Sequence, residues 1–217
     1  MRLRYLPSLA VNLGRALLDS HDVEALLRGE ELSSIAAMRR LPAVLEAYPE
    51  GRALLRDRPQ LTSATVDLAA LRRLPQTTLG GAFVAHLDRN GLDLDALAGR
   101  VSAGDSREQN WLLERVRQTH DIWHTVLGLD VAPHEEVLAH AFQWAQLHMP
   151  YSWLVVGFGT PKHFLLEGRW RALHRLPAAY QAGERAQPLI AVYWERHWSE
   201  DLDRLRERLG ILTAEAW

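Results

Sequence analysis

Hydrophobic residues recur every three or four positions along most of this chain, and proline or glycine ends each run. This spacing places apolar side chains on one face of an α-helix, where they can pack against a core. In the first half the pattern predicts short helices separated by Pro42, Pro49, Pro59 and Pro75. They cover residues 9–18, 31–41, 51–56, 68–74 and 79–90.

The second half shows longer helical patterns and holds all eight tryptophans of the chain, most of which we expect in the core. The predicted helices cover residues 108–127, 133–149, 162–181 and 188–209. Pro177 is expected to kink or end the third of them. The sequence lacks the alternating runs with hairpin turns that would predict strands. The pattern therefore predicts an all-α fold, with a single compact multi-helix domain over residues 1–217.

One apolar run, at residues 150–161, follows a different pattern. It is too short to span a membrane and too apolar for an ordinary surface loop. It could form the wall of a pocket for an apolar ligand, or touch a membrane surface. A buried corner between two helices is the interpretation that we favour.

The composition is that of a globular protein with one hydrophobic core, since 47% of the 217 residues are hydrophobic and 24% are charged. The 25 Lys and Arg residues nearly balance the 27 Asp and Glu residues, and no basic run stands out, so nucleic-acid binding is not indicated. The absence of cysteine excludes disulfides, thiolate catalysis and cysteine-ligated metal sites. No stretch approaches the ~20 apolar residues of a membrane-spanning helix.

The first seven residues contain two arginines, but they have neither a long apolar stretch nor a small-residue cleavage site. Asp19 and Asp22 come early for an organelle transit peptide. We therefore expect the sequence to begin as a mature protein.

The strongest chemical signal is a cluster of two imidazoles and two carboxylates, His120, Asp121, His124 and Glu136. Residues four apart lie on one face of a helix, so the two histidines can meet one ion. Asp121 lies about 100° further round the helix, as a direct ligand or as a group that holds an imidazole N–H. The sequence therefore predicts a metal site.

The fourth residue of this cluster reaches the histidines only if the chain turns back after them. Gly128 can end the first helix in the left-handed conformation, and Pro133 suits the first turn of the next helix. The connection is short, so the two helices should lie side by side. Glu136 would then stand in the opening turn of the second helix, next to the histidines.

Two nitrogen and two oxygen donors suit a divalent ion, zinc first, with iron or manganese as alternatives. Magnesium prefers oxygen donors, so the histidines count against it. The histidines also occupy positions where an ordinary helix would carry leucine. A neutral histidine pair bonded to backbone carbonyls and to Glu136 would therefore satisfy the same buried polar groups without an ion.

Other polar groups give weaker signals. His140 and Gln143 share the helix face of Glu136, so His140 could join the site from one turn further along. Residues 195–197 flank an aromatic helix and could touch the site. A second His-Asp pair, His21-Asp22, keeps a metal phosphohydrolase open as an alternative, which would need further ligands on other helices.

The chain resembles the ubiquinone (coenzyme Q) biosynthesis protein four family, whose members carry His-Asp-x-x-His, eleven residues and then Glu. The spacing of His120, Asp121, His124 and Glu136 matches that motif in full. Further likeness lies in Pro49-Glu50-Gly51, in the stretch from Leu74-Pro75 to Leu79-Gly80, and in Tyr193-Trp194-Glu195-Arg196-His197-Trp198 through Leu209-Gly210-Ile211. The resemblance covers nearly the whole chain.

The resemblance implies an all-helical fold in which His120, Asp121, His124 and Glu136 are the metal ligands and the catalytic residues. It implies a metal-dependent, oxidative decarboxylation at C1 of a polyprenylated hydroxybenzoate, together with organisation of the other ubiquinone-biosynthesis enzymes. A non-catalytic lipid-binding scaffold is the alternative. The sequence departs from the family pattern at Glu135, where glycine is usual, and at His140 and Gln143, where lysine and glutamate are usual.

The same resemblance sets expectations about partners and location. The partners would be a polyprenylated aromatic quinone precursor, the other enzymes of the pathway and a membrane surface, and a homodimer is a further candidate. Because such a substrate dissolves in lipid, we expect a bacterial cytoplasmic protein attached peripherally to the inner face of the membrane.

Overall fold

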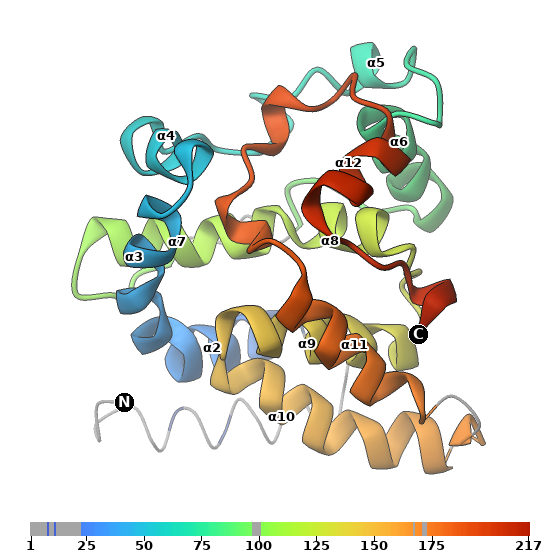
Figure 1. The fold of residues 1–217 in the computed structure, drawn as a ribbon. Coiled ribbons are helices and arrows are strands. Elements are labelled where there is room, and N and C mark those ends of the chain that lie inside the picture. Colours follow the sequence, from blue (N-terminus) through green and yellow to red (C-terminus); the bar gives the residue numbers. More distant parts are fainter. Residues whose placement is uncertain (1–7, 9–10, 12–22, 97–100, 167, 171–172) are drawn as a thin grey trace.

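The computed structural model describes residues 8, 11, 23–96, 101–166, 168–170 and 173–217 (Figure 1). Nearly all of the helix predicted at 9–18 and the His21-Asp22 pair lie outside these residues. The described helical elements are α2 (Val23–Ser34), η2 (Ile35–Arg40), α3 (Leu41–Glu46), α4 (Pro49–Asp57), α5 (Leu68–Leu71), α6 (Leu79–Asn90), α7 (Arg107–Gln118), α8 (His120–Leu127), α9 (Pro133–Leu147), α10 (Pro150–Gly159), the π-helix η3 (Thr160–Leu166), α11 (Arg175–Arg185), η5 (Leu189–Ala191), η6 (Trp194–Arg196), α12 (Leu202–Leu209) and η7 (Ala214–Ala216). These residues contain no β-strand, so the all-α prediction is confirmed.

Two predicted helices are found with the bounds, or nearly the bounds, that their local signals indicated. Helix α6 spans Leu79–Asn90, because the Thr78 hydroxyl accepts a hydrogen bond from the Gly81 N–H and Gly91 ends the helix at φ 61°. Helix α9 begins at Pro133 as expected. It ends two residues earlier than predicted, because His148 takes the left-handed conformation at φ 45°.

The helix predicted at 108–127 is two helices, α7 and α8, with a break at Thr119. The Thr119 hydroxyl donates to the Arg115 carbonyl, and the backbone there adopts φ −96° and ψ 0°. A hydroxyl that bonds back to the preceding turn commonly bends a helix. His120 is consequently the first residue of α8.

The prediction of one helix at 188–209 is wrong. Two 3-10 turns, η5 and η6, precede the short helix α12. Backbone N–H groups of this segment donate to residues that are distant in the sequence. The Tyr193 N–H donates to the Glu50 carboxylate, and the Leu202 N–H donates to the Thr77 carbonyl. These tertiary hydrogen bonds replace hydrogen bonds that a continuous helix would form. The hydrophobic spacing along the sequence does not indicate them.

The predictions for the adjoining segments are also wrong in part. Residues 150–161 form helix α10 and the start of η3, with Trp153 52% and Phe158 51% exposed, so they are not a buried corner. The helix predicted at 162–181 is η3 followed, further along, by α11. Pro177 lies in the first turn of α11 rather than ending it, since proline lacks only an N–H that the first turn leaves unpaired.

Helix α9 lies at the centre of one layer, with α10 and α11 packed against it (Figure 1). Helices α6, α8 and α12 form the part above it in that view, and α4 lies beside them. One hydrophobic core joins these parts, since its buried side chains come from every region between Ile35 and Ala214. The helices therefore form one compact domain around a shared core.

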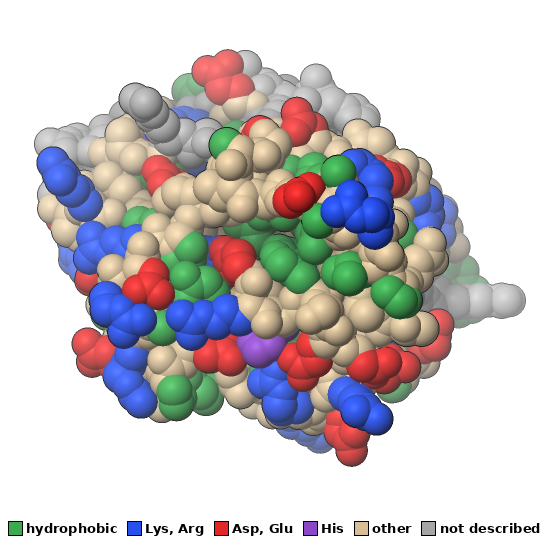
Figure 2. Space-filling view, turned by 90° about the horizontal axis from the view of Figure 1, so that it is seen from above, with side chains coloured by type: hydrophobic (Ala, Val, Ile, Leu, Met, Phe, Trp, Pro, Cys, Tyr) green, Lys and Arg blue, Asp and Glu red, His purple; other side chains and the backbone are tan. Residues whose placement is uncertain are grey.

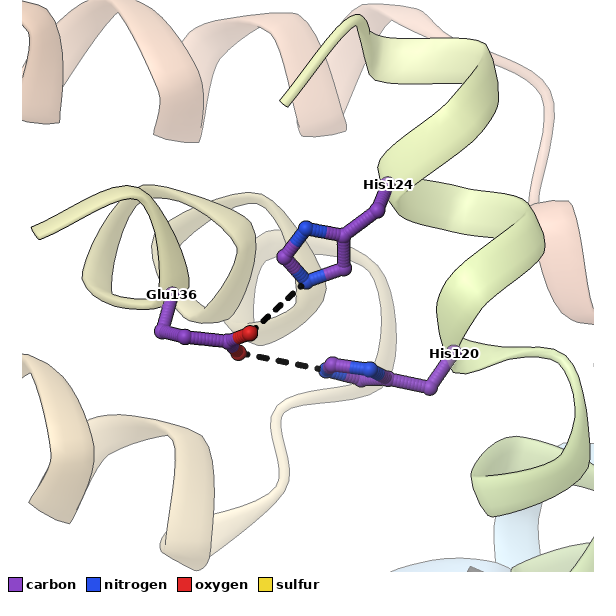
Figure 3. Close-up of side chains that lie close together, drawn as sticks. All are labelled: His120, His124 and Glu136. Carbon is purple, nitrogen blue, oxygen red and sulfur yellow. Dashed lines mark ion pairs between the residues drawn. The ribbon is translucent and has the colours of Figure 1, made fainter. Parts of the chain in front are cut away.

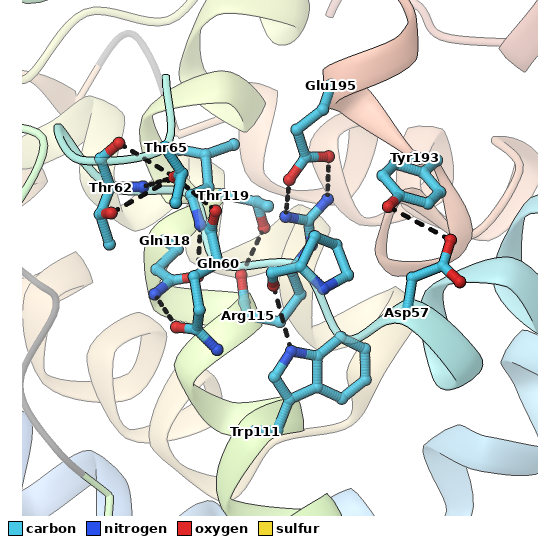
Figure 4. Close-up of polar contacts among 12 residues, drawn as sticks. Asp57, Gln60, Thr62, Thr65, Trp111, Arg115, Gln118, Thr119, Tyr193 and Glu195 are labelled. Atoms are coloured by element: carbon cyan, nitrogen blue, oxygen red, sulfur yellow. Dashed lines mark hydrogen bonds and ion pairs between the residues drawn. The ribbon is translucent and has the colours of Figure 1, made fainter. Parts of the chain in front are cut away.

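A buried ion pair ties α7 to the C-terminal part of the chain (Figure 4). The Arg115 guanidinium donates to both oxygens of Glu195, at 2.5 and 2.8 Å, and its side chain is 1% exposed. On the same helix, Trp111 donates to the Pro59 carbonyl and Gln118 accepts the Leu61 N–H. Helix α7, which leads directly into the motif helix α8, is thus fixed from two sides.

The surface of the described residues does not point to a membrane span or to a nucleic acid. No described helix combines the length and the apolar composition that crossing a membrane requires. Figure 2 shows the face above α4, α5, α6 and α12, where basic and acidic side chains are interspersed around a hydrophobic area. This face therefore lacks the continuous basic surface on which nucleic-acid binding depends.

Replacing Arg115 by methionine should lower the free energy of unfolding by about 2–3 kcal/mol, because Glu195 keeps its charge in a mostly buried position without a partner. Urea denaturation followed by circular dichroism measures the loss. The double variant Arg115→Met with Glu195→Met should recover part of it, since no unpaired charge remains.

Arg72→Met is the matched control, because Arg72 forms a similar pair with Asp88 at 2.7 Å on the surface, where both side chains are about half exposed. We expect little change in stability there. A loss for Arg115→Met no larger than for this control would show that the buried pair does not anchor α7.

Candidate metal centre

Three of the four motif side chains converge at the junction of α8 and α9 (Figure 3). His120 and His124 extend from successive turns of α8, with ring centroids 4.7 Å apart. Glu136 extends toward them from the first turn of α9. One ligand atom from each residue lies within 4.8 Å of the other two. The predicted convergence of the histidine pair with Glu136 is therefore what the structure shows.

The connection between the helices has the predicted form. Gly128 ends α8 at φ 68°, and Pro133 occupies the first turn of α9. Two hydrogen bonds close the turn: the Leu129 N–H donates to the His124 carbonyl, and the Asp130 N–H donates to Glu135. This short turn places Glu136 opposite the histidine face.

The donor atoms are separated by distances that suit a shared cation. The Nε2 atoms of both histidines face the Glu136 carboxylate, each one opposite a different oxygen. His124 Nε2 lies 3.4 Å from Glu136 Oε1, and His120 Nε2 lies 3.6 Å from Glu136 Oε2. Both distances are longer than a normal N–H···O hydrogen bond. Two ligands at about 2.05 Å from a tetrahedral zinc ion lie about 3.3 Å apart. The spacing therefore fits ligands of one ion better than directly bonded partners.

The hydrogen bond at Nδ1 of His124 determines whether its other nitrogen, Nε2, carries a proton. His124 Nδ1 lies 3.1 Å from the Asp130 carbonyl oxygen, which can only accept, so Nδ1 carries the proton. In the neutral ring Nε2 then presents a lone pair toward Glu136. This atom is buried and has no hydrogen-bond partner. A proton between the two atoms, or a cation, makes the contact attractive.

Asp121 lies on the other side of His120 from Glu136. Its Oδ1 is 3.5 Å from His120 Nδ1, while His120 Nε2 is the atom that faces Glu136. Asp121 is not one of the three residues whose ligand atoms converge. In this arrangement its carboxylate contacts the far side of the His120 ring, and orienting that ring is one of the two roles that its sequence position left open.

The charges of the cluster shift its pKa values strongly. Burial by itself lowers the pKa of His120, but Asp121 and Glu136 outweigh it and raise that pKa to about 9. Burial raises the pKa of Glu136, but His124 and His120 outweigh it and lower that pKa to about 2. In the absence of an ion, the carboxylate thus holds a proton on an imidazole close to it.

Two further histidines border the cluster. His140, on α9, is buried with its ring 6.0 Å from that of His120, and its Nδ1 lies 3.3 Å from the Ser152 hydroxyl. Burial, together with the charge of His120, lowers the pKa of His140 to about 3, so this ring is neutral. His140 therefore adjoins the site, as its helix face indicated. Gln143 bonds to Met149 Sδ instead.

His86 is a neighbour that the sequence analysis did not find. It lies on α6, 4% exposed, and its ring centroid is 5.9 Å from that of His124. Burial and the charge of His124 lower its pKa. The one available signal was a histidine among the apolar residues of α6, such as Phe83 and Leu87.

The polar residues at 195–197 serve other parts of the fold. Glu195 pairs with Arg115, and His197 lies between Glu50, at 3.0 Å, and Glu200, at 2.7 Å. These contacts join the C-terminal region to α4 and α7. They give Glu195 and His197 a structural role, and none of the residues 195–197 belongs to the group of converging ligand atoms.

The donor set fits a divalent ion. Two imidazole nitrogens and one carboxylate oxygen are three of the four ligands that zinc takes in catalytic sites. The buried lone pair of His124 has no hydrogen-bond partner, and the Glu136 side chain is 33% exposed. Iron and manganese accept the same donors.

Comparison with known proteins identifies a family and several relatives of this chain. Residues 6–215 match the family described as Coenzyme Q (ubiquinone) biosynthesis protein Coq4. The chain is 41% identical over 175 residues, 79% of its length, to the ubiquinone biosynthesis protein COQ4 of Pyricularia oryzae. It is 39% identical over 165 residues, 75% of its length, to the corresponding protein of Pyrenophora tritici-repentis. The chain spans 56% of the length of each of these two relatives.

A crystal structure of a protein from Nostoc punctiforme that is named for ubiquinone biosynthesis has the same fold. The TM-score is 0.74, and the match covers 94% of this chain and 97% of that one. The sequences are 23% identical, so this likeness concerns the fold alone.

The comparisons correct the expected location. The curated relatives from Pyricularia oryzae and Pyrenophora tritici-repentis are named as mitochondrial proteins. The expectation of a bacterial cytoplasmic protein is therefore wrong. It was inferred from the solubility of a substrate in lipid, which says nothing about the compartment.

The family match extends over nearly the whole chain, and it includes the α8–α9 junction where the two histidines and Glu136 meet. The chain therefore belongs to the Coenzyme Q (ubiquinone) biosynthesis protein Coq4 family.

Proposed function

We propose that this chain holds a divalent ion, zinc in the first place, between His120, His124 and Glu136. We propose further that this centre removes the ring carboxylate at C1 of a polyprenylated hydroxybenzoate during ubiquinone synthesis. The observation that supports this most is the buried Nε2 of His124, which points its lone pair at a carboxylate oxygen 3.4 Å away. Membership of the family supports a place in ubiquinone biosynthesis; the substrate class is part of the proposal.

Each residue of the cluster has a definite part in this proposal. His124 is fixed as a ligand by its bond to the Asp130 carbonyl, and Asp121 orients the ring of His120. Neutral His140 borders the site without adding charge. The bound ion supplies Lewis-acid stabilisation of negative charge on the carboxylate or phenolate of the ring.

In this proposal, most of the binding energy of the substrate comes from apolar contacts of its polyprenyl tail. Each buried methylene of a polyprenyl chain contributes about 0.8 kcal/mol, so apolar contacts can dominate affinity while the polar site orients the ring. Loss of carbon dioxide leaves an electron pair on C1. A proton takes up this pair in a simple decarboxylation, whereas an oxidative reaction requires an added oxidant.

A non-catalytic lipid-binding scaffold for the other enzymes of the pathway is the second candidate. It is favoured by the large apolar side chains that remain exposed on α10 and η3, among them Trp153, Phe158 and Leu166. Such a surface fits a lipid or a partner protein without requiring any chemistry.

His120→Ala and Glu136→Gln should each lower the bound ion from one per chain to nearly none, because each removes one of three ligands. Metal analysis of the purified proteins measures this. Ubiquinone content of cells that lack their own family member should fall together with metal binding when these variants replace the natural chain. Normal ubiquinone levels with a metal-free variant would remove the catalytic role.

His148→Asn is the matched control. His148 is exposed at the end of α9 with φ 45°, a conformation that asparagine tolerates. Its metal content and ubiquinone production should equal those of the natural chain. Loss of metal in this variant would mean that the assay reports unfolding rather than ligation.

Metal binding should release about one proton per ion near pH 7, because the ion displaces the proton that His120 holds with a pKa of about 9. The apparent affinity should therefore fall about tenfold for each pH unit below 9. Calorimetry in two buffers of different ionisation enthalpy counts the protons. Asp121→Asn should lower the pKa of His120 and reduce the release, and an unchanged proton count would contradict the assigned contact.

Turnover separates the enzyme from the scaffold. The purified, metal-loaded chain is incubated with a short-tailed carboxylated precursor, with and without dioxygen, and carbon dioxide is measured. Release that His124→Ala abolishes supports catalysis. Binding of the precursor without carbon dioxide release under either condition would leave the scaffold as the function.

A further inference from the structure

Two buried aromatic side chains beside the candidate metal centre are not among its converging ligands. They are Tyr151, near the start of α10, and His140 on α9, and each is 8% exposed. Their rings pack edge-on, with centroids 5.6 Å apart, and the His140 ring lies 6.0 Å from that of His120. Tyr151 is therefore separated from a ligand of the proposed ion by one ring.

The hydroxyl of Tyr151 lacks a hydrogen-bond partner among the described residues, although the side chain is more than nine-tenths buried. The backbone N–H of Tyr151 donates to the Ser34 hydroxyl, which fixes the start of α10 on α2. Buried polar side-chain atoms in native proteins are nearly always hydrogen-bonded, and a buried tyrosine hydroxyl usually finds a partner. An exception next to a cluster of ligands points to a group that binds there.

The surroundings of this hydroxyl keep it in the form that donates a hydrogen bond. Burial, together with the charges of Glu30 and Glu136, raises the pKa of Tyr151. The charge of Arg117 acts in the opposite direction, but Arg117 is paired with Glu30 at 2.7 Å. The phenol therefore carries its proton at neutral pH.

His140 presents a second polar atom next to this hydroxyl. Its Nδ1 lies 3.3 Å from the Ser152 hydroxyl, so Nε2 is the nitrogen that remains for another contact. Glu136 and His140 are four residues apart and share one face of α9, along which α10 packs (Figure 1). The Tyr151 hydroxyl and this nitrogen thus border the same side of α9 as the ligand Glu136.

The charge balance of this region indicates what kind of oxygen it accepts. In the proposed function the ion binds the substrate carboxylate and balances Asp121 and Glu136. Glu30 is paired with Arg117, so no surplus positive charge remains beside Tyr151 for a second anion. A phenolic hydroxyl is neutral, and it can accept from Tyr151 and donate to an imidazole nitrogen.

We propose that the Tyr151 hydroxyl binds the ring hydroxyl of the substrate, so that Tyr151 determines specificity for a hydroxylated aromatic acid. This inference rests on the proposed function, which places the carboxylate end of the ring at the ion. A site built to bind a substrate hydroxyl discriminates against the analogue that lacks it, because the buried group of the protein is then left unpaired.

Tyr151→Phe tests this role, because phenylalanine keeps the ring that packs on His140 and removes only the hydroxyl. Calorimetry measures the affinity of the metal-loaded chain for 3-prenyl-4-hydroxybenzoate and for 3-prenylbenzoate, which differ only in the ring hydroxyl. The natural chain should bind the hydroxylated acid about five to ten times more tightly. The variant should lose this preference and bind 3-prenylbenzoate as the natural chain does.

Tyr180→Phe is the matched control. Tyr180, on α11, also packs edge-on against an aromatic ring, that of Trp144, with centroids 5.5 Å apart. This variant should bind both acids as the natural chain does. The metal content of both variants should equal that of the natural chain, because neither change removes a ligand of the ion.

Three results would overturn the proposal. One is a preference for the hydroxylated acid that Tyr151→Phe leaves unchanged, and another is equal binding of the two acids by the natural chain. The third is an equal loss of affinity for both acids in Tyr151→Phe, which would show that the hydroxyl acts on the structure. A preference that depends on Tyr151, without carbon dioxide release from the hydroxylated acid, would support the role of Tyr151 in binding and remove only the decarboxylation.

Discussion

The arrangement around α8 and α9 depends on one contact: a buried imidazole nitrogen of His124 that faces a carboxylate oxygen of Glu136. The Asp130 carbonyl fixes the proton of His124 on Nδ1, so Nε2 can neither donate to Glu136 in the neutral ring nor find water. Two electron-rich atoms held 3.4 Å apart in a mostly buried place repel each other unless positive charge lies between them. The fold must therefore supply a proton or an ion at this point.

Much of the surrounding structure serves to hold that contact. Glu135, at a position where the family pattern has glycine, accepts the Asp130 N–H and so fixes the carbonyl that orients His124. From the C-terminal part of the chain, Arg206 donates to the carbonyls of Thr125 and Val126 and thereby satisfies the end of α8. The departure from the family pattern at Glu135 thus has a structural explanation, since a side chain now closes the turn.

How far the sequence could predict this structure depends on how local each determinant is. The α6 bounds, the α8–α9 turn and the histidine pair follow from caps and spacing within a few residues, and they were predicted. The break at Thr119 depends on the acceptor to which the Thr119 hydroxyl donates. The 3-10 turns after Pro188 depend on Glu50 and Thr77, and the contact of His86 depends on how α6 packs. The spacing of hydrophobic residues does not indicate contacts with residues that are distant in the sequence.

The charge balance of the cluster explains why an ion suits it better than protons alone. Asp121 and Glu136 both have lowered pKa values and are ionised at neutral pH, while His140 is kept neutral. Without an ion, the negative charges of these two partly buried carboxylates favour protons on the histidine rings, which is why the pKa of His120 is raised. A divalent ion would balance both carboxylates with every imidazole neutral, which is the form that ligates metal. The neutral rings of His86 and His140 then add no repulsion toward the ion.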